Sequence, residues 1–348
     1  MSLDDVRAIE RIDQHDTRTI LVDFPLQCRR GRALPAGAPP AGGRPRLIVV
    51  AGMGGSASGG DMVAACASET LDVPILVHRG YGLPAAAGRD TLVIAVSYSG
   101  GTAEVLSAAE AALARRVPLV AVTAGGALGA LADARGLPRV TLPDGLMPRM
   151  ALGYLVFPLL AVLAGCGAPV ASAAEIDEAL DVLAAQAGEL GPACPADRNA
   201  AKRLALGIGE RLPVVYGGPL TATAAYRWKT DLEENAKVFA VAGAVPEMNH
   251  NEIETWRGPA ARARHLVLLR EDHEAPAIAR RFELVREMAA PDAGGVSEIW
   301  ARGTGPLARL LSLAYASQWV SFYVAMLRGI DPWPVPMLEE VKRRLTSP

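Results

Sequence analysis

Short apolar runs that end at glycine-rich turns constrain the fold of this chain more than any other feature. The runs are rich in Val, Ile and Leu, helical patterns separate them, and they occupy residues 46–53, 74–80, 91–96, 118–124, 139–143, 212–218, 264–271 and 295–303. Strands without polar alternation are buried on both faces, which is typical of parallel sheets covered by helices. The alternating order therefore predicts an α/β fold.

The strand–helix pattern occurs twice along the chain. The first set lies within a predicted domain at 46–190. The second lies within a predicted domain at 191–348, which begins with the linker GPACPADRN. Residues 1–45 contain a predicted helix at 3–25 and a linker rich in Pro and Gly. A chain of 348 residues is long enough for two domains of ordinary size. We therefore expect an N-terminal segment and two tandem domains, each a parallel sheet flanked by helices.

Charge and cysteine content argue against several kinds of partner. Lys and Arg number 35 against 37 Asp and Glu, so the chain lacks the positive charge of a nucleic-acid-binding protein. The basic stretch at 29–46 is interrupted by Pro and Gly, and we interpret it as a solvated loop. The four cysteines have neither metal-ligand nor redox spacing. We expect no nucleic-acid partner, no metal and no cofactor.

One apolar run, at 150–170, is long enough to raise the question of a membrane span. Gly153, Pro158 and Gly165 interrupt it, and we interpret it as a buried core helix. The N-terminus is charged and is unlike a signal peptide. The sequence therefore predicts a soluble, cytoplasmic protein that does not bind a membrane.

The first strand is followed by a glycine-rich loop, GMGGSASGGD, that suits a bound anion. Gly52, Gly54 and Ala57 match the G-x-G-x-x-A pattern of dinucleotide sites. The next strand lacks the acidic residue that such sites require, but Arg79 could hold a 2′-phosphate, so an NADP-dependent oxidoreductase is one alternative. Glycine also allows the backbone to approach any bound group closely, and Ser56 adds a hydroxyl.

A second loop, SYSGGTAE, places three hydroxyls, on Ser97, Ser99 and Thr102, where a helix begins. Free N–H groups at a helix N-terminus favour an anion, and hydroxyls add donors without adding charge. Ser and Thr are also ordinary N-caps, so a single hydroxyl would need no further explanation. Three hydroxyls beside the other loop favour a cradle for a phosphate monoester, to which we also assign Gly54, Gly55 and Ser56. Neither loop contains a P-loop or a G-x-S-x-G motif.

Together the two loops resemble the phosphosugar-binding loops of the sugar isomerase (SIS) fold. More specifically, the chain resembles the bifunctional phosphoglucose/phosphomannose isomerases, which have two SIS-like domains. Four further segments resemble motifs of that family in the same order: MPRMALGYL (147–155), DLEENAKV (231–238), PEMNHNEIE (246–254) and DPWPVPMLEEVKRRL (331–345). The resemblance implies a metal-independent isomerase of glycolysis and gluconeogenesis that interconverts glucose 6-phosphate, and mannose 6-phosphate, with fructose 6-phosphate.

The resemblance also implies roles for charged residues. Aldose–ketose isomerisation requires a carboxylate to carry a proton, positive charge near the enediolate, and an acid/base to open the ring. By resemblance, Glu234 carries the proton and His250 opens the ring from the partner subunit of a homodimer. Lys342 and Arg149 supply positive charge. Without the resemblance, Glu234 cannot be distinguished from Glu233, His250 reads as a structural histidine and Lys342 reads as a solvated charge.

Some features leave alternatives open. Gly101 stands where the family often has Asn, and Trp333 where many relatives carry a smaller residue, often Thr. Bulk near the sugar could alter the choice between glucose and mannose epimers. Asn249 and Asn251 flank His250 and could fix its orientation. A second hypothesis is a non-catalytic phosphosugar-binding regulator with the SIS fold, although the N-terminal segment is short for the DNA-binding domain that such proteins usually carry.

Overall fold

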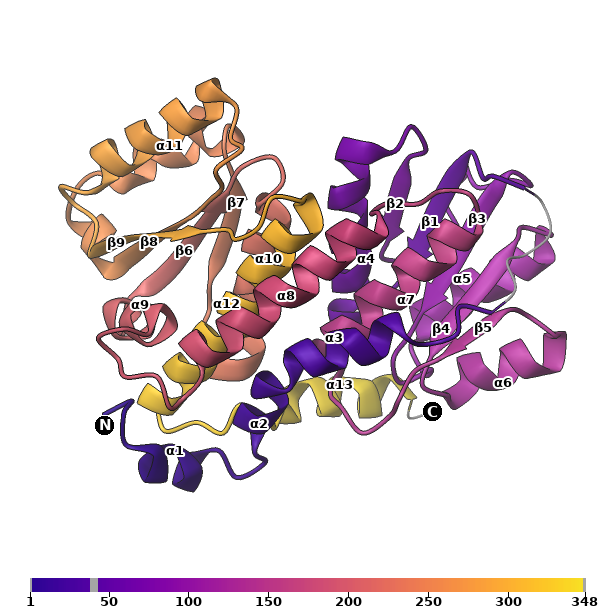
Figure 1. Ribbon diagram of the computed structural model, residues 1–348, viewed down its shortest axis with the longest axis horizontal. Coiled ribbons are helices and arrows are strands. Elements are labelled where there is room, and N and C mark those ends of the chain that lie inside the picture. The colour runs from indigo at the N-terminus through magenta and orange to yellow at the C-terminus, as the bar shows by residue number, and fades with distance from the viewer. Residues whose placement is uncertain (1, 38–42, 347–348) are drawn as a thin grey trace. The chain divides into compact units, whose positions relative to one another are not determined.

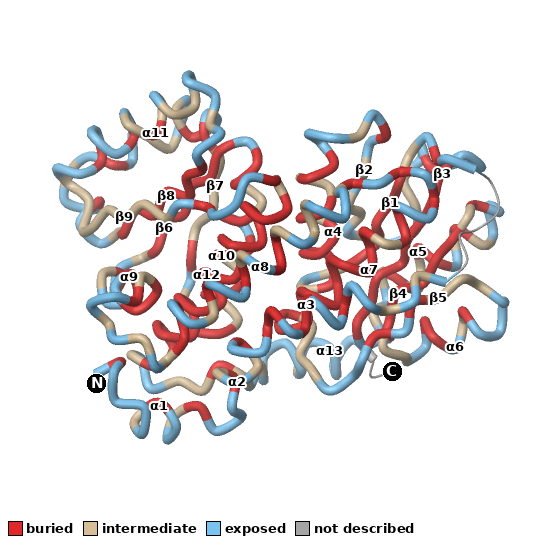
Figure 2. The backbone as a smooth tube through the Cα atoms, viewed as in Figure 1, coloured by how far each residue is buried: buried red, intermediate tan, exposed pale blue. Residues whose placement is uncertain are grey.

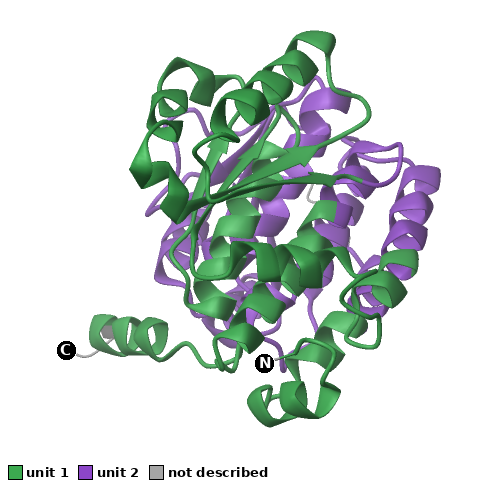
Figure 3. Cartoon of the chain, turned by 90° about the vertical axis from the view of Figure 1, so that its left-hand side faces the viewer, with its two compact units in different colours: residues 1–22, 185–301, 313–348 green, residues 23–184, 302–312 purple. Residues whose placement is uncertain are grey.

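The computed structural model describes residues 2–37 and 43–346. It divides into two compact units, which Figure 3 colours separately. Unit 1 comprises Met1–Val22, Ala185–Ala301 and Leu313–Pro348, and unit 2 comprises Asp23–Ala184 and Arg302–Ser312. Residues 1–22, expected to belong to a separate N-terminal segment, lie in unit 1. The domain bounds at 45 and 190 stay a prediction.

Unit 2 contains a five-stranded parallel sheet of order β2-β1-β3-β4-β5 (Figure 1). Its strands are β1 (Leu47–Ala51), β2 (Ile75–His78), β3 (Thr91–Val96), β4 (Leu119–Thr123) and β5 (Arg139–Thr141). Because β1 lies between β2 and β3, the chain leaves β1 toward one edge of the sheet and later returns to its other side. The carboxyl ends of β1 and β3 therefore form a topological switch point, where open α/β sheets bind ligands.

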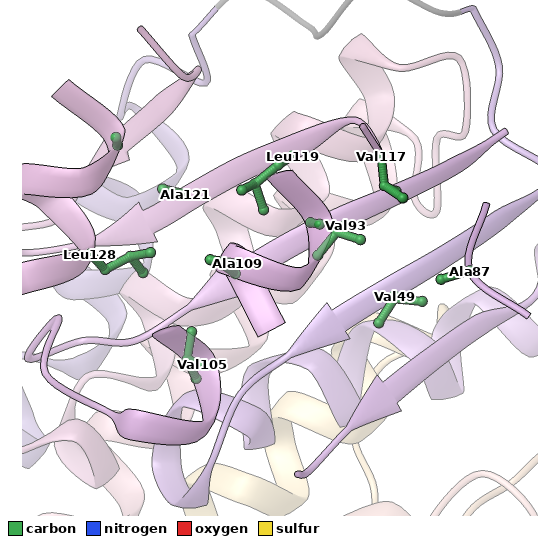
Figure 4. Close-up of a cluster of buried hydrophobic side chains, with 12 residues drawn as sticks. Val49, Ala87, Val93, Val105, Ala109, Val117, Leu119, Ala121 and Leu128 are labelled. Carbon is green, nitrogen blue, oxygen red and sulfur yellow. The ribbon is translucent and has the colours of Figure 1, made fainter. Parts of the chain in front are cut away.

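Helices cover both faces of this sheet. The helices of unit 2 are α3 (Phe24–Arg32), α4 (Gly54–Thr70), α5 (Ala103–Ala114), α6 (Gly126–Arg135), α7 (Leu152–Gly165) and the first part of α8 (Ala173–Leu190). Helices α4, α5 and α6 pack on the strands, α7 packs on α4, and α3 packs on α7. Figure 4 shows one apolar layer, in which Val49 and Val93 of the sheet belong to one cluster with Ala109 of α5 and Leu128 of α6. Val50, the next residue of β1, lies against α4 instead, where a Cβ on Gly60 would be 2.8 Å from its Cγ1. The alternation along β1 explains why every residue from Ile48 to Ala51 is apolar.

Unit 1 contains a four-stranded parallel sheet of order β7-β6-β8-β9. Its strands are β6 (Leu212–Gly217), β7 (Val241–Ala244), β8 (Arg264–Arg270) and β9 (Gly295–Trp300). The helices are α1 (Val6–Ile12), α2 (Thr17–Val22), α9 (Ala200–Ile208), α10 (Ala222–Ala236), α11 (Pro276–Ala289), α13 (Pro336–Thr346) and most of α12 (Pro306–Leu327). β6 lies between β7 and β8, so this sheet has its own switch point at the ends of β6 and β8. The predicted α/β fold with two parallel sheets is confirmed.

Two apolar helices lie in the interior of the protein (Figure 2). The run at 150–170 forms α7, whose 14 residues are mostly buried, so the predicted core helix is confirmed. The second is α12, which by length and composition could cross a membrane. Within the described chain, 94% of the most apolar 18-residue stretch of α12 is buried, which is typical of a core helix.

Other local predictions were wrong or incomplete. The predicted helix at 3–25 is three short helices, because the Asp13 carboxylate caps the N-terminus of α2 and Asp16 adopts a left-handed conformation. Helix α4 begins at Gly54, inside the glycine-rich loop described from the sequence. The basic stretch at 29–46 was expected to be a loop, but its first residues, 29–32, belong to helix α3. Arg29 and Arg32 of this helix form ion pairs with Asp181 and Asp177 of α8. Strand β7 and helices α8 and α9 were not predicted; residues 38–42 of the basic stretch lie outside the described residues.

Candidate functional site

The loop after β1 places the N-terminus of α4 at the switch point of unit 2. Gly54, the first helical residue, has φ +50°, which side chains other than glycine rarely adopt. Gly55 lies against the 3₁₀ turn η1 (Pro148–Met150), so that a Cβ there would be 2.7 Å from both the Arg149 nitrogen and the Pro148 carbonyl carbon. Glycine thus allows the start of α4 and the Arg149 turn to touch. The first N–H groups of a helix have no intrahelical acceptor, so they are donors available to an anion.

The loop after β3 brings its three hydroxyls to the start of α5. Ser97 is buried, and its Oγ lies 2.9 Å from Oγ1 of Thr102, the N-cap residue of α5. Ser99 is exposed, and its Oγ accepts from the Gly101 N–H at 3.4 Å. Gly100 has φ +71°, and a Cβ there would lie 1.8 Å from the Gly125 carbonyl oxygen. The loop therefore requires glycine at position 100, whereas a Cβ at Gly101 would meet nothing within 4 Å.

Two hydroxyls connect the two loops to the segment before Arg149. The Ser56 hydroxyl accepts a hydrogen bond from the Tyr98 N–H at 3.1 Å. The Tyr98 hydroxyl donates to the Pro143 carbonyl at 2.7 Å and accepts from the Leu146 N–H at 3.2 Å. Burial raises the pKa of Tyr98, so this hydroxyl keeps its proton near neutral pH. The structure thus brings the predicted phosphate-binding residues together as one connected set of loops.

Arg149 is 3% exposed, so its guanidinium is buried, where a charge is costly unless it is paired. Gln27 of α3 hydrogen-bonds to the same turn and to the start of α7, which follows it. Its Nε2 donates to the Met150 carbonyl and its Oε1 accepts from the Gly153 N–H, both at 2.8 Å. Gln27 and Tyr98 were not predicted as site residues, because their partners are distant in sequence and no local motif marks them. Together with the contact to Gly55, they fix the backbone that carries Arg149.

The alternative of an NADP site depended on Arg79 being available to hold a 2′-phosphate. Arg79 forms an ion pair with Asp61 of α4. Burial raises the pKa of Asp61, although the Arg79 charge acts in the opposite direction. The Arg79 guanidinium is therefore engaged by the protein itself. What the two loops offer is a set of helix N-terminal N–H groups and neutral hydroxyls, which suits a phosphate monoester.

Glu234 lies in the last turn of α10, in unit 1. Glu234 and its neighbour Glu233 are both half-buried, and Glu233 forms an ion pair with Lys229 at 2.7 Å on the same helix. A buried polar stripe holds α10 against α12. Arg227 and Asp231 are paired at 2.8 Å, Ser317 donates to Asp231, and Asn235 donates to Ser321 at 2.9 Å. These bonds fix the rotation of α10 about its axis, and therefore the direction in which Glu234 leaves the helix.

Lys237 joins the end of α10 to the C-terminal segment. It is the C-cap residue of α10 and has φ +55°. Its Nζ donates to the Glu234 carbonyl and to the Pro332 carbonyl, the latter at 3.4 Å. The chain that leads to Lys342 therefore begins next to the turn that carries Glu234.

His250 and Lys342 are exposed and lie on other elements of unit 1. His250 ends the 3₁₀ turn η2 (Glu247–His250). The expectation that the flanking asparagines orient it is wrong for Asn251, whose side chain bonds the Glu252 N–H at 2.6 Å and Glu247 at 3.2 Å. Asn249 Oδ1 is buried without a hydrogen-bond partner in the part of the chain that the structure describes.

Among the described residues, 2–37 and 43–346, no group of three or more His, Cys, Asp or Glu side chains is placed to hold a metal ion.

Comparisons with known proteins identify the two halves of the chain. Residues 44–135 match the SIS domain family. Residues 197–345 match the family described as bacterial phospho-glucose isomerase C-terminal SIS domain. The chain also matches a solved structure from Thermus thermophilus, a "glucose-6-phosphate isomerase like protein", with a TM-score of 0.66, 22% identity, and 99% of each chain covered. At that identity the match supports the fold.

Two relatives carry the same name. The chain is 37% identical to a bifunctional phosphoglucose/phosphomannose isomerase from Caldicellulosiruptor bescii, over 86% of this chain and 89% of the relative. It is 32% identical to the protein of that name from Thermoplasma acidophilum, again over 86% and 89% of the two chains. The chain therefore belongs to the bifunctional phosphoglucose/phosphomannose isomerase family.

Proposed function

We propose that this protein interconverts fructose 6-phosphate with glucose 6-phosphate and mannose 6-phosphate. One observation supports this most directly: in a chain of the isomerase family, two helix N-termini and their hydroxyls meet at the switch point of unit 2. The relatives are named for activity on both phosphoglucose and phosphomannose. Since sugar phosphates are charged and do not cross membranes unaided, we place the activity in the cytoplasm.

The phosphate of the sugar binds at the two loops in this proposal. The N–H groups at the starts of α4 and α5, near Gly54, Gly55 and Thr102, donate to its oxygens. Ser56, Ser97 and Ser99 add hydroxyl donors of no net charge. Binding through neutral groups holds the phosphate while allowing product release.

The proton transfer occurs at C1 and C2 of the open-chain sugar. Glu234 removes a proton from C1 of fructose 6-phosphate, which gives an enediolate, and then returns a proton to C2. Return to one face of C2 gives the glucose epimer and return to the other gives the mannose epimer. Arg149 and Lys342 stabilise the negative charge on the enediolate oxygens. His250 opens the ring before this step.

We propose a homodimer in which His250 serves the partner subunit. The exposure of His250 on η2 supports this, because an exposed side chain can reach another protomer. Analytical ultracentrifugation tests the assembly. Mixing Glu234→Gln with His250→Ala tests the shared site, since mixed dimers would contain one intact site if His250 serves the partner. Activity regained on mixing supports the exchange, and a mixture as inactive as its components contradicts it.

The test of function uses EDTA-treated protein and fructose 6-phosphate, with the products resolved by chromatography. We expect both glucose 6-phosphate and mannose 6-phosphate. Glu234→Gln should lose almost all turnover while keeping its affinity for the sugar phosphate. Glu233→Gln is the matched control and should retain activity, because Glu233 is paired with Lys229.

Each departure from that result has a defined meaning. Wild-type turnover in Glu234→Gln would contradict the assignment of the base. A single product would keep the isomerase class and direct attention to Trp333, with Trp333→Thr as the variant to examine. Binding without any product would contradict the proposed function and favour a phosphosugar-binding regulator.

A further inference from the structure

We propose that His15 is a positioning residue for this enzyme. With Asp331 and Trp333 it forms a clamp, defined by these three residues, that holds the start of the C-terminal segment. The clamp thereby sets where α13 and its Lys342 lie with respect to Glu234, all within unit 1. The inference rests on the proposed function for its catalytic consequence, but its structural part can be tested separately.

His15 stands on a well-fixed turn between α1 and α2. The Asp13 carboxylate accepts hydrogen bonds from the Thr17 and Arg18 N–H groups, at 2.8 and 3.0 Å. Asp16 adopts φ +53°, which closes the turn. The Tyr315 hydroxyl of α12 donates to the Leu21 carbonyl at 2.8 Å, so the turn is also anchored to the core of unit 1. His15 is therefore presented by a rigid support, although its side chain is 47% exposed.

His15 makes two contacts with the C-terminal segment, 316 residues later in the sequence. Its Nδ1 lies 2.6 Å from Oδ2 of Asp331. Its ring stacks on the Trp333 indole, with centroids 6.0 Å apart and an interplanar angle of 7°. The other oxygen of Asp331 accepts from the Trp333 N–H at 3.1 Å, so one carboxylate joins both partners. The bulk of Trp333 is directed to the His15 ring.

The clamp and Lys237 hold adjacent residues of the same segment. Lys237 donates to the Pro332 carbonyl, between the two residues that contact His15, and also to the Glu234 carbonyl. After residue 333, the apolar side chains of α13 bury little surface: Met337 and Leu345 are both 76% exposed. Figure 3 shows α13 extending from the rest of unit 1. The position of Lys342 therefore depends on how firmly residues 331–333 are held.

The experiment compares His15→Ala, His15→Phe and the control His273→Ala, which removes an exposed histidine from the same unit. Hydrogen exchange of peptides covering 331–346 measures the clamp directly. We expect faster exchange in His15→Ala, partial protection in His15→Phe because a ring can still stack on Trp333, and wild-type exchange in His273→Ala. Trp333→Thr should resemble His15→Ala.

Steady-state kinetics with fructose 6-phosphate then measure positioning. We expect kcat of His15→Ala to fall on the order of 10- to 100-fold, as for other small misplacements of a catalytic group, with partial recovery in His15→Phe. Affinity for the sugar phosphate should change little, because the phosphate loops lie in unit 2. A purely structural role would leave kcat of the folded variant unchanged.

The outcomes separate the two proposals. Unchanged exchange at 331–346 in His15→Ala overturns the clamp, and faster exchange with wild-type kcat overturns the positioning role. If the wild-type enzyme turns over no sugar phosphate, the proposed function fails. The exchange result would then still decide whether His15 holds the C-terminal segment.

Discussion

The two switch points of this molecule have the same topology and opposite chemistry. In unit 2, β3 ends at Val96 and is followed by Ser97-Tyr98-Ser99-Gly100. In unit 1, β8 ends at Arg270 and is followed by Glu271-Asp272-His273-Glu274. The first loop offers neutral hydroxyls and glycine beside an open helix N-terminus. The second carries three carboxylates, which repel a phosphate.

The polar groups of the unit 1 switch point are also engaged internally. Arg270 forms ion pairs with Glu274 at 2.7 Å and Glu298 at 2.9 Å, and its guanidinium lies 4.7 Å from the ring centroids of Phe282 and Trp300. Thr221 bonds both the Gly218 N–H and the Leu269 carbonyl. A parallel sheet thus supplies the place for a ligand, and the side chains decide whether one is bound.

All five tryptophans, at positions 228, 256, 300, 319 and 333, lie in unit 1. Tryptophan fluorescence during urea unfolding therefore reports on unit 1 alone, whereas circular dichroism reports on both units. Measured together, the two signals separate effects on the two switch points.

The largest expected effect is that of Arg270→Met on unit 1. The variant leaves the Glu274 and Glu298 carboxylates without their buried cation. We expect a loss of about 3–5 kcal/mol from the free energy of unfolding, seen by tryptophan fluorescence. Affinity for fructose 6-phosphate, measured by calorimetry under native conditions, should stay at the wild-type value. A large loss of affinity would mean that the unit 1 switch point takes part in binding.

Gly100→Ala should have the next largest effect, confined to unit 2. The residue has φ +71° and its Cβ would overlap the Gly125 carbonyl oxygen, so we expect a loss of at least about 2 kcal/mol together with weakened sugar phosphate binding. Gly101→Ala is the matched control, because its Cβ would enter open space. Equal effects of the two substitutions would contradict the described loop conformation.

Matched threonine substitutions should separate binding from stability. Thr102→Val removes a hydroxyl from the loop that we propose binds the phosphate. We expect affinity for fructose 6-phosphate to fall by about tenfold, the loss of one charge-assisted hydrogen bond. Thr221→Val removes an internal bond, and we expect a stability loss of about 1–3 kcal/mol with unchanged affinity. The reverse pattern would exchange the roles assigned to the two switch points.

The smallest expected effect is a pH dependence of unit 1. Burial lowers the pKa of His265 of β8, so between its two pKa values the unfolded chain binds more protons than the folded one. Stability should therefore be fully present above about pH 6.5 and decline as the pH falls further. His265→Gln, which retains a polar atom for Ser297, should show a shallower decline by tryptophan fluorescence. A steeper decline in the variant would contradict the direction of the shift.

How much of the fold could be predicted depended on how far apart in the sequence the interacting residues are. Strands such as β1 and β3 were predicted because complete burial makes them continuous apolar runs. Helix α8 was missed although Ser172 and Glu175 form a capping box at its start, which is a local signal. Strand β7 was missed because it is short and contains Gly243, which is required by the Tyr216 ring 2.6 Å from its Cβ position.

The candidate site divides in the same way. The hydroxyls of Ser97 and Thr102 could be proposed from the sequence because they belong to one loop with a local pattern. The bond from Tyr98 to Ser56, the hold of Gln27 on the Arg149 turn, and the stack of His15 on Trp333 each join residues far apart in sequence. Only folding brings such partners together, so no local sequence motif could predict these contacts.

A crystal structure with bound fructose 6-phosphate tests the central claim most directly. We expect the phosphate within hydrogen-bond distance of the N–H groups and hydroxyls at 54–56 and 97–102, with no sugar phosphate at the ends of β6 and β8. A phosphate bound instead near Thr221 and Glu271 would contradict the assignment of the two switch points.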